Sequence, residues 1–342
     1  MTLDTMADAQ QDLPQPWRQT PLIHSTLLSK HAGCQIYLKL ENLQPSGSFK
    51  SRGIGNFLLA HLAKTANTEE REAVHFYSSS GGNAGLACVH AAVTLGTPAT
   101  IIVPMSTTEY TIAKMRAAGA AEVIQHGDSW AEADGFLKET VIPLANAKGE
   151  HAVYVPPFDA SEIWDGHATM VEEIFKQLGP SSQPPDALIC SVGGGGLFCG
   201  IMRGLENVNH PNLRVLAVET EGAHSLALSL EKGKLSTLPA ITSIATTLGA
   251  RTVASQAFAY AQRNSVRSVV LSDSVAKEGC VRFADDERIM VEAACGVSLA
   301  LCYNGRLKEI LPNLQRQSKV VIIVCGGSNI TAKMLGDWSE SM

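Results

Sequence analysis

Residues 187–202 read ALICSVGGGGLFCGIM: an apolar run, four consecutive glycines and a second apolar run. The first run is typical of a buried parallel strand, and the second predicts a helix. Between them, Gly193, Gly194, Gly195 and Gly196 let the backbone curl so that its N–H groups converge at the positive end of the helix. The stretch predicts an α/β fold with a phosphate-binding turn, and the alternative is a flexible turn.

A lysine occupies a second turn of this kind. Residues 45–53 read PSGSFKSRG, with Lys50 at the sixth place, and they follow the strand-like run 36–40. Proline and glycine predict a tight turn, and Ser46 or Ser48 can cap the helix that follows. In a partly dry pocket the pKa of a lysine falls, and its amine can form a Schiff base. The alternative is a solvated surface lysine.

Two further glycine-rich turns follow apolar runs. Residues 78–85 read SSSGGNAG, and their hydroxyl, amide and N–H groups at a helix start suit a carboxylate. An ordinary turn with Asn83 as the helix cap is the alternative. Residues 320–329 read VVIIVCGGSN, a buried strand that ends in Cys325 and two glycines. For Cys325 the alternative is an ordinary buried thiol.

Strand-like runs alternate with helical patterns along the chain, which favours mostly parallel sheets flanked by helices. We expect strands at 36–40, 74–77, 100–103, 152–155, 188–191, 215–219 and 320–325. We expect helices at 53–63, 84–95, 111–118 and 273–283, in addition to the one after the four glycines.

Composition limits the class of protein. With 342 residues, 45% of them hydrophobic, the chain can bury a large core in one large domain or two. A net charge of −6 without a basic run argues against nucleic-acid binding, and no apolar stretch is long enough to cross a bilayer. The eight cysteines include no C-x-x-C pair, which fits a reducing compartment. Since the polar, acidic start is unlike a signal peptide, we expect a cytoplasmic protein.

The four turns, in this order, resemble those of the fold-type II pyridoxal-phosphate enzymes. Within that group the chain is similar to the L-serine/L-threonine dehydratases, in particular the L-serine dehydratase branch. The resemblance runs from about residue 21 to about residue 330. Five further stretches carry it: TPL at 20–22, YVPPFD at 154–159, IWDGH at 163–167, AVETEGAHS at 217–225 and IMVEAACG at 289–296.

The resemblance implies an α/β fold like that of the tryptophan synthase β subunit, with two domains of mostly parallel twisted sheets. A large domain would comprise residues 1–44 and 158–342. A small domain, residues 45–157, would be inserted in it and would close over the substrate. The cofactor would lie in the cleft between the two domains, which is a common place for ligands. A homodimer is also implied.

The resemblance further implies pyridoxal 5'-phosphate as cofactor and assigns the residues around it. Lys50 would hold the aldehyde as a Schiff base and act as the base, with Phe49 packed against the ring. Asn83 would contact the ring hydroxyl, and Cys325 would lie at the pyridine nitrogen. The phosphate would bind Gly193, Gly194, Gly195 and Gly196. The substrate carboxylate would bind Ser80, Gly81, Gly82 and Asn83.

The implied reaction is β-elimination of L-serine to pyruvate and ammonia, and of L-threonine to 2-oxobutanoate and ammonia. A thiol at Cys325 is a poor donor and would leave the ring nitrogen largely unprotonated. Similar serine racemases have a serine at position 81 as a second base, and Gly81 cannot take a proton. Thr247 is another departure, because the branch tends to have alanine there. The alternatives are a serine racemase, a β-replacement enzyme such as cysteine synthase, and a cofactor-binding pseudoenzyme.

A monovalent cation, potassium, is implied as well. Relatives bind it through backbone carbonyls beside the phosphate loop, which leave no side-chain signature in a sequence. The matching positions here are Gly193, Glu219, Ala223, Leu248 and Ala250. For the Glu219 side chain the alternative is a carboxylate paired locally at the edge of the core.

Overall fold

The computed structural model describes residues 13–65, 73–179 and 182–342, and they divide into two compact units. The first unit comprises the chain up to Arg18 and Gln44–Gly166, and the second comprises Gln19–Leu43 and His167–Met342. Each unit holds a mostly parallel sheet with helices packed on it, which confirms the α/β class. The domain boundaries, the cleft and the closure expected from the resemblance stay predictions.

The second unit is built on a six-stranded sheet with the order β1-β2-β10-β7-β8-β9. Only the β1–β2 pair is antiparallel. The carboxyl ends of the neighbouring strands β10, β7 and β8 therefore meet at one edge, where ligands of open α/β sheets bind. The strands are β1 Leu22–Ser25, β2 Gln35–Leu40, β7 Ala187–Ser191, β8 Arg214–Thr220, β9 Val266–Leu271 and β10 Lys319–Val324.

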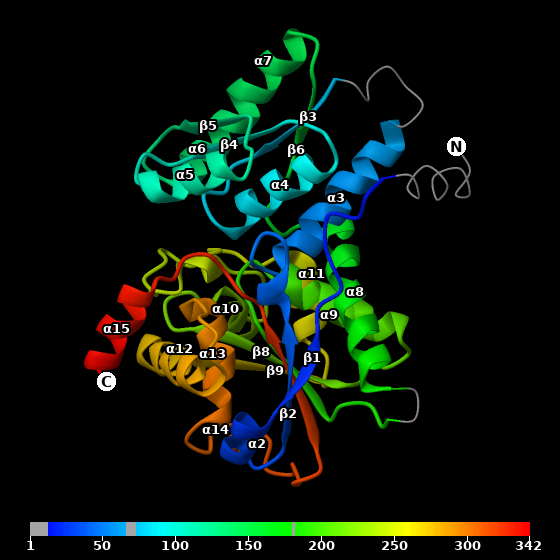
Figure 1. Ribbon diagram of the computed structural model, residues 1–342, viewed down its shortest axis with the longest axis vertical. Coiled ribbons are helices and arrows are strands. Elements are labelled where there is room, and N and C mark those ends of the chain that lie inside the picture. The colour runs from blue at the N-terminus through cyan, green and yellow to red at the C-terminus, as the bar shows by residue number, and fades with distance from the viewer. Residues whose placement is uncertain (1–12, 66–72, 180–181) are drawn as a thin grey trace. The chain divides into compact units, whose positions relative to one another are not determined.

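Helices cover both faces of this sheet, with α12 and α13 on one side and α8 and α9 on the other (Figure 1). α8 spans Ser161–Leu178 and belongs to this unit from His167 onward. The other helices are α2 Thr26–Ala32, α9 Gly196–Asn207, α10 Ser225–Lys232, α11 Ser255–Ala261, α12 Asp273–Glu287, α13 Ala293–Leu299, α14 Arg306–Ile310 and α15 Ala332–Glu340, with short turns η1 Glu41–Leu43, η4 Thr246–Leu248 and η5 Ala300–Cys302.

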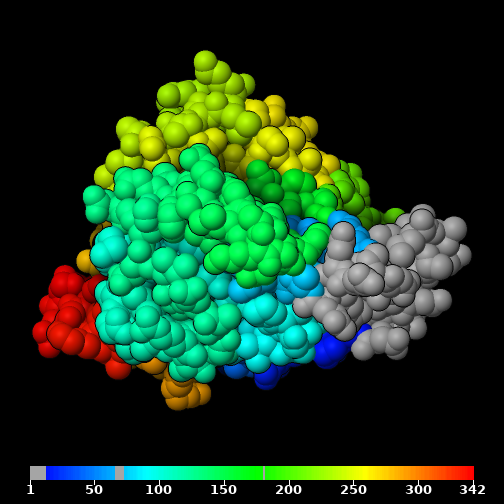
Figure 2. Space-filling view, turned by 90° about the horizontal axis from the view of Figure 1, so that it is seen from above, coloured from blue at the N-terminus to red at the C-terminus, as the bar shows by residue number. Residues whose placement is uncertain are grey.

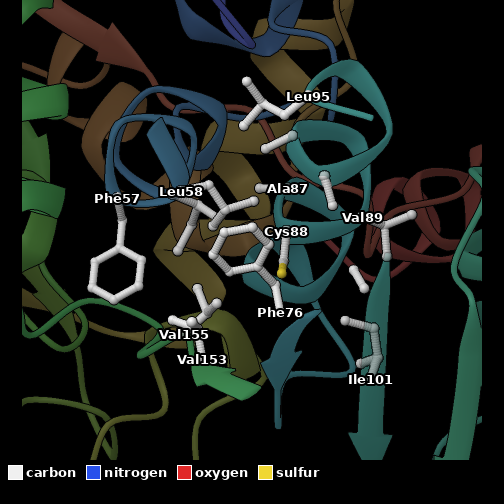
Figure 3. Packing of buried hydrophobic residues seen from close by; sticks show 14 of the residues in the cluster. Phe57, Leu58, Phe76, Ala87, Cys88, Val89, Leu95, Ile101, Val153 and Val155 are labelled. Carbon is white, nitrogen blue, oxygen red and sulfur yellow. The ribbon is translucent and has the colours of Figure 1, made fainter. Parts of the chain in front are cut away.

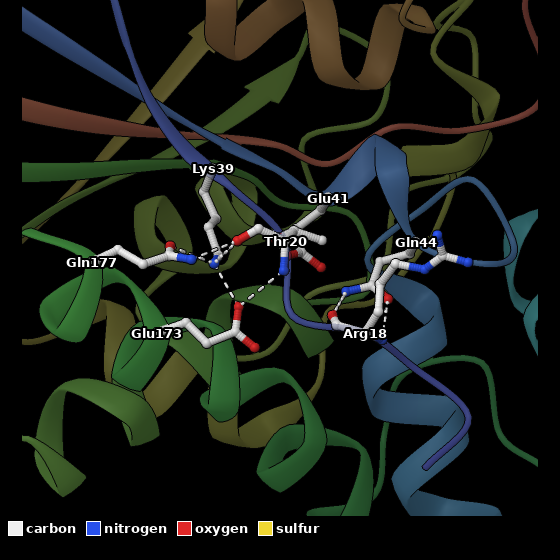
Figure 4. Close-up of polar contacts among 7 residues, drawn as sticks. All are labelled: Arg18, Thr20, Lys39, Glu41, Gln44, Glu173 and Gln177. Atoms are coloured by element: carbon white, nitrogen blue, oxygen red, sulfur yellow. Dashed lines mark hydrogen bonds and ion pairs between the residues drawn. The ribbon is translucent and has the colours of Figure 1, made fainter. Parts of the chain in front are cut away.

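A buried lysine ties α8 to β2 in the second unit. The Lys39 ammonium is fully buried, and it donates to Thr20 O at 2.8 Å, to Gln177 Oε1 at 3.0 Å and to the Glu173 carboxylate (Figure 4). A buried charge is tolerated only when it is paired and hydrogen-bonded, as here. Lys39 therefore has a structural role.

The first unit contains a four-stranded parallel sheet with the order β5-β4-β3-β6. In the view from above, the chain from α5 to α7 forms much of the visible surface of the first unit (Figure 2). The strands are β3 Val74–Ser78, β4 Ala99–Val103, β5 Glu122–Gln125 and β6 His151–Tyr154. The helices are α3 Lys50–Thr65, α4 Asn83–Thr94, α5 Glu109–Ala117, α6 Trp130–Phe136 and α7 Ile142–Ala147, with the π-helical turn η3 Leu137–Val141 before α7.

The core of this unit lies between α3, α4 and the sheet. Leu58 from α3, Phe76 from β3, Val89 from α4 and Ile101 from β4 are among its buried side chains (Figure 3). Fully burying one such side chain contributes roughly 1.5–3 kcal/mol. This packing holds the starts of α3 and α4 in place, and both starts carry predicted site residues.

All the strands expected from the sequence are present, with bounds that differ by at most one residue at either end. Three strands were not expected, namely β1, β5 and β9, and each lies at the edge of a sheet. Edge strands are half exposed and lack the continuous apolar run that signals a central parallel strand. Among the described residues, no helix is long and apolar enough to span a membrane.

Candidate functional site

Lys50 is the first residue of α3 and lies at the carboxyl edge of the sheet in the first unit. Its ammonium donates to the carbonyl oxygen of Pro157, which follows β6. β6 pairs in parallel with β3, so the turn after β3 ends at the same edge. The Lys50 Nζ atom lies 5.3 Å from the centroid of the Phe49 ring. The structure thus brings Lys50 and Phe49 to the edge that also carries residues 78–83.

Burial makes Lys50 a better nucleophile than a surface lysine. It lowers the pKa of the amine from 10.5 to about 8, because the charged form is desolvated. A substantial fraction of the amine is therefore neutral near pH 7 to 8, and only the neutral amine can attack a carbonyl or take a proton.

The expected serine cap of α3 is not formed by Ser48. Its buried hydroxyl has no hydrogen-bond partner within the described ranges. The Ser46 hydroxyl contacts Ser51 Oγ at 2.8 Å, and the backbone N–H of Ser51 donates to Ser48 O at 3.2 Å. In this tight turn the N–H group of Ser51 is therefore paired with a backbone carbonyl and not with a serine hydroxyl. Residue types alone do not reveal such a pairing.

The loop Ser80–Asn83 runs from β3 into α4, which begins at Asn83. Ser80 Oγ accepts a hydrogen bond from the backbone N–H of Gly82 at 3.3 Å. A Cβ at Gly85 would lie 1.8 Å from Ser80 O, so only glycine fits where the helix crosses the loop. These contacts fix the path of the loop and leave N–H and hydroxyl groups at the start of a helix, as a carboxylate site requires.

Gly81 has room for a small side chain. Its backbone φ lies outside the left-handed range, so the conformation does not require glycine. A Cβ would lie 3.3 Å from Thr107 Oγ1 and 3.3 Å from Val103 Cγ1. Such contacts are tight and need a shift of a few tenths of an ångström. The identity of this residue is therefore not dictated by the backbone.

In the second unit, the four glycines link β7 to α9 at the carboxyl edge of the sheet. Gly195 has a φ of 92° and a ψ of −2° and precedes α9 without a side-chain cap. A Cβ on it would lie 2.5 Å from Ala257 Cβ, and one on Gly193 would lie 2.9 Å from Leu248 Cα. The turn is therefore built for glycine. The first N–H groups of α9 have no partner within the helix and are suited to an anion.

Cys325 follows β10, the neighbour of β7, and so lies at the same edge. Its pKa is raised well above the ordinary value by a hydrogen bond with Cys295 and by burial. The thiol therefore stays protonated and neutral at physiological pH. A neutral thiol is a weak donor and a weak acceptor, which is the property that the predicted role next to a pyridine nitrogen needs.

Glu219 lies near the end of β8 and is fully buried. Its carboxylate accepts from Leu226 N at 2.9 Å and from Ala227 N at 2.8 Å, at the start of α10. Burial raises the pKa of this group to about 7, and the two hydrogen bonds oppose the rise. The side chain thus has the local pairing that was the alternative to a ligand, and its backbone carbonyl remains a predicted ligand.

The other predicted cation ligands belong to loops at the same edge. Leu248 packs against Gly193, and its carbonyl accepts from Ala250 N at 2.7 Å. The N–H of Ala223 donates to Thr220 O at the end of β8. Among the described side chains there is no group of three or more His, Cys, Asp or Glu that could hold a metal ion.

Glu292 was missed by the sequence reasoning. Its buried carboxylate accepts from Thr247 Oγ1 at 2.5 Å and from Asn329 N at 3.2 Å. A Cβ on Gly327 would overlap it, at 2.0 Å from Glu292 Cδ. Glu292 therefore supports the turn that follows Cys325. Only its place in the stretch IMVEAACG pointed to it, and the departure at Thr247 is explained by this hydrogen bond.

Each unit, taken by itself, carries groups suited to part of pyridoxal phosphate or of an amino-acid substrate. The first unit offers an amine with a lowered pKa, the buried and unpaired hydroxyl of Ser48, and the loop Ser80–Asn83. The second unit offers a turn that excludes side chains at Gly193 and Gly195, and a thiol that stays protonated. These are the donors that an aldehyde, a carboxylate, a phosphate and a pyridine nitrogen need.

Comparisons with known proteins agree with this chemistry. A family model for pyridoxal-phosphate dependent enzymes matches residues 13–326. An L-serine dehydratase of Saccharomyces cerevisiae is 44% identical over 322 residues, which are 92% of this chain and 94% of the relative. The human L-serine dehydratase/L-threonine deaminase is 41% identical over 336 residues, 95% of each chain.

The solved structure of an L-serine ammonia-lyase from the fungus Rhizomucor miehei is similar with a TM-score of 0.86 and 34% identity, over 96% of this chain and 99% of that one. A maize serine racemase has a TM-score of 0.78 and 25% identity, over 99% of both chains. With a family match over most of its length, the chain belongs to the pyridoxal-phosphate-dependent enzyme family.

Proposed function

We propose that this protein is an L-serine/L-threonine ammonia-lyase. It would convert L-serine to pyruvate and ammonia, and L-threonine to 2-oxobutanoate and ammonia. The observation that carries the proposal is the partly buried Lys50 amine, with a pKa of about 8, at the edge that also carries the loop Ser80–Asn83. The relatives named L-serine dehydratase support the choice of substrate.

Each residue has a stated task in this proposal. Lys50 would hold the cofactor through its amine and, once displaced by the substrate, would take the α-proton. The loop Ser80–Asn83 would bind and orient the substrate carboxylate, with Asn83 also on the ring hydroxyl. Gly193–Gly196 would bind the phosphate, and Phe49 would pack against the ring. When bound, pyridoxal phosphate supplies the electron sink that makes the α-proton acidic.

Two residues would direct the reaction toward elimination. The neutral Cys325 thiol cannot keep the ring nitrogen protonated, which limits side reactions such as transamination. Gly81 offers no second base, and racemisation requires acid–base groups on both faces of the substrate. We therefore favour elimination over racemisation, although serine racemases share the fold.

We further propose a potassium ion held by the carbonyls of Gly193, Glu219, Ala223, Leu248 and Ala250. We also propose a homodimer in the cytoplasm. The eight cysteines are all free and buried, which supports a reducing compartment. The proximity of Gly193 to Leu248 supports the cation site.

A steady-state comparison of L-serine, L-threonine and D-serine tests the function, with pyruvate, 2-oxobutanoate and D-serine measured as products. We expect pyruvate from L-serine, 2-oxobutanoate from L-threonine, and neither consumption nor formation of D-serine. Diversion of the product to cysteine on adding sulfide would indicate a β-replacement enzyme. An absorbance spectrum unchanged by serine, with no product, would indicate a pseudoenzyme.

A further inference from the structure

A buried carboxylate lies beneath the loop Ser80–Asn83 in the first unit. Asp134, in α6, accepts from Ser79 Oγ at 2.6 Å and from the Tyr154 hydroxyl at 2.8 Å, both at Oδ1. Its Oδ2 accepts from Lys138 Nζ at 2.7 Å. Lys138 also lies over the Tyr154 ring, 4.3 Å from its centroid. Asp134 thus links α6, β6 and the residue that directly precedes the loop.

The charge of Asp134 is maintained by these contacts. Burial alone would raise the pKa of the carboxyl, but the hydrogen bonds from Lys138, Ser79 and Tyr154 lower it below its ordinary value. Asp134 is therefore ionised at neutral pH. Hydrogen bonds to an ionised acceptor are about twice as strong as neutral ones, so the Ser79 hydroxyl is firmly held.

The loop has few other side-chain restraints at its entrance. Ser78 Oγ is buried and has no hydrogen-bond partner among the described residues. The Ser80 hydroxyl is engaged within the loop itself, with Gly82 N. Ser79 is thus the residue through which a neighbouring element anchors the strand end. The turn η3, in which Lys138 lies, is π-helical, a local irregularity that is frequent at functional sites.

We propose that Asp134 is a positioning residue that orients the carboxylate-binding loop Ser80–Asn83 through its hydrogen bond with Ser79. The proposal rests on the proposed function, which assigns this loop to the substrate carboxylate. Loss of the anchor displaces the loop N–H groups relative to the carboxylate. It therefore weakens binding of carboxylate ligands more than it slows the reaction of bound substrate.

The test uses the holoenzyme and two small ligands, glycine and ethanolamine. Both carry an amine. Glycine has a carboxylate but no β-substituent, and ethanolamine has a hydroxyl but no carboxylate, so neither can undergo the elimination. For Ser79→Ala we expect glycine to bind about tenfold more weakly by calorimetry, because the strand end loses its charge-assisted hydrogen bond to Asp134. Ethanolamine binding should be unchanged. With L-serine, KM should rise about tenfold and kcat should change less than about twofold.

Two variants serve as controls. Ser79→Thr keeps the hydroxyl and should restore glycine binding. Tyr154→Phe removes the other hydroxyl from Asp134 Oδ1 and leaves the Ser79 hydroxyl in place, and it should change glycine binding less than about threefold. If Asp134 and its hydrogen-bond partners had a purely structural role, glycine and ethanolamine would lose affinity equally. Ser79→Ala and Tyr154→Phe would also have equal effects. That result would overturn the proposal.

A double-mutant cycle tests whether Asp134 acts through Ser79. The effects of Ser79→Ala and Asp134→Asn should not add. The double variant should bind glycine with the same affinity as the single variant that binds it less tightly. Additive losses would contradict the proposal. If Asp134→Asn does not fold, the comparison of Ser79→Ala with Ser79→Thr still decides it. Wild-type protein that neither binds glycine nor releases pyruvate from L-serine would instead refute the proposed function.

Discussion

The local environment shifts the pKa values of Lys50 and Cys325 in opposite directions, and both shifts favour the neutral form of the group. Desolvation lowers the pKa of the lysine amine to about 8. The pKa of the Cys325 thiol is raised by its hydrogen bond with Cys295 and, after that, by desolvation. A neutral amine can attack a carbonyl, and a neutral thiol cannot hold a proton on a pyridine nitrogen. At both residues the local environment thus favours the neutral form that the proposed task needs.

The pKa of Lys50 predicts how the apoprotein takes up its cofactor. Below its pKa the amine is protonated and unreactive, so the rate of covalent attachment should rise with pH and reach half its maximum near pH 8. The measurement is borohydride trapping of pyridoxal phosphate followed by peptide mapping. The exposed Lys333 serves as the control site. A midpoint near 10.5, the ordinary value for lysine, would show that Lys50 is not desolvated in solution.

Cys325→Asp should impair clean elimination. A carboxylate at this position would favour a protonated ring nitrogen and a longer-lived carbanion. We expect a new long-wavelength absorbance band in the presence of L-serine and pyruvate release that is slower by about tenfold or more. Cys325→Ser, which keeps a neutral hydroxyl, is the matched control. If the aspartate variant has the spectrum and rate of the parent, Cys325 does not face the ring nitrogen.

At the scale of elements, the candidate site residues occupy the ends of strands and the starts of helices. Lys50 begins α3, Asn83 begins α4 and Gly196 begins α9. Helix starts combine unpaired N–H groups with the positive end of the helix dipole, so they attract carboxylates and phosphates. The sequence pattern predicts these positions well because a buried apolar run followed by glycine and serine is a local signal.

Gly81→Ser tests the loop that leads into α4. The backbone at Gly81 accepts an L residue, and the nearest neighbours of an added Cβ are side-chain atoms of Thr107 and Val103. The variant should fold with a loss of stability below about 1 kcal/mol, and its hydroxyl could serve as a second base. We expect D-serine to form in the variant but not in the parent, measured by chiral chromatography. D-serine formed by the parent at a rate comparable with pyruvate would exclude the one-base mechanism.

The carboxyl group of Glu219, in β8, accepts hydrogen bonds from the start of α10, and it predicts a free energy of unfolding that depends on pH and potassium. Its pKa in the folded protein is about 7, against an ordinary 4.5, so the folded state binds an extra proton between these values. Stability from this group should therefore fall, by about 3 kcal/mol, as pH rises through this window. Potassium nearby favours the ionised carboxylate and should reduce the fall.

The measurement for Glu219 is the free energy of unfolding by urea between about pH 5 and pH 8, in potassium and in tetramethylammonium chloride. Glu219→Gln is the control, because it cannot ionise. The free energy of unfolding of the parent minus that of the variant should decrease with rising pH in tetramethylammonium chloride. In potassium chloride the decrease should be smaller. A difference that increases with pH would show that the carboxylate is ionised throughout.

The sequence was less informative about contacts between distant segments. Asp134 lies 55 positions from Ser79, and Glu292 lies 45 positions from Thr247. Neither pairing follows from a local pattern, since the topology of the sheets decides which segments meet. The edge strands β1, β5 and β9 were missed for a related reason, because their half-exposed residues carry little periodic signal.

At the scale of the whole molecule, each unit repeats the same arrangement. A parallel sheet brings several strand ends to one edge, and glycine-rich turns at that edge carry the candidate residues. The α/β class and the order of the four turns were predictable, because central parallel strands are continuous apolar runs. The proposed cation ligands cannot be identified from residue types, because any residue has a backbone carbonyl.

The central claim is that Lys50 carries the cofactor and performs the elimination. The most direct test measures pyruvate release from L-serine, with the visible absorbance of the cofactor, in the parent and in Lys50→Ala, with Lys333→Ala as a control at an exposed lysine. The account predicts a yellow parent and control that release pyruvate, and a Lys50→Ala protein with neither covalent cofactor nor measurable release. Full pyruvate release by Lys50→Ala would contradict it.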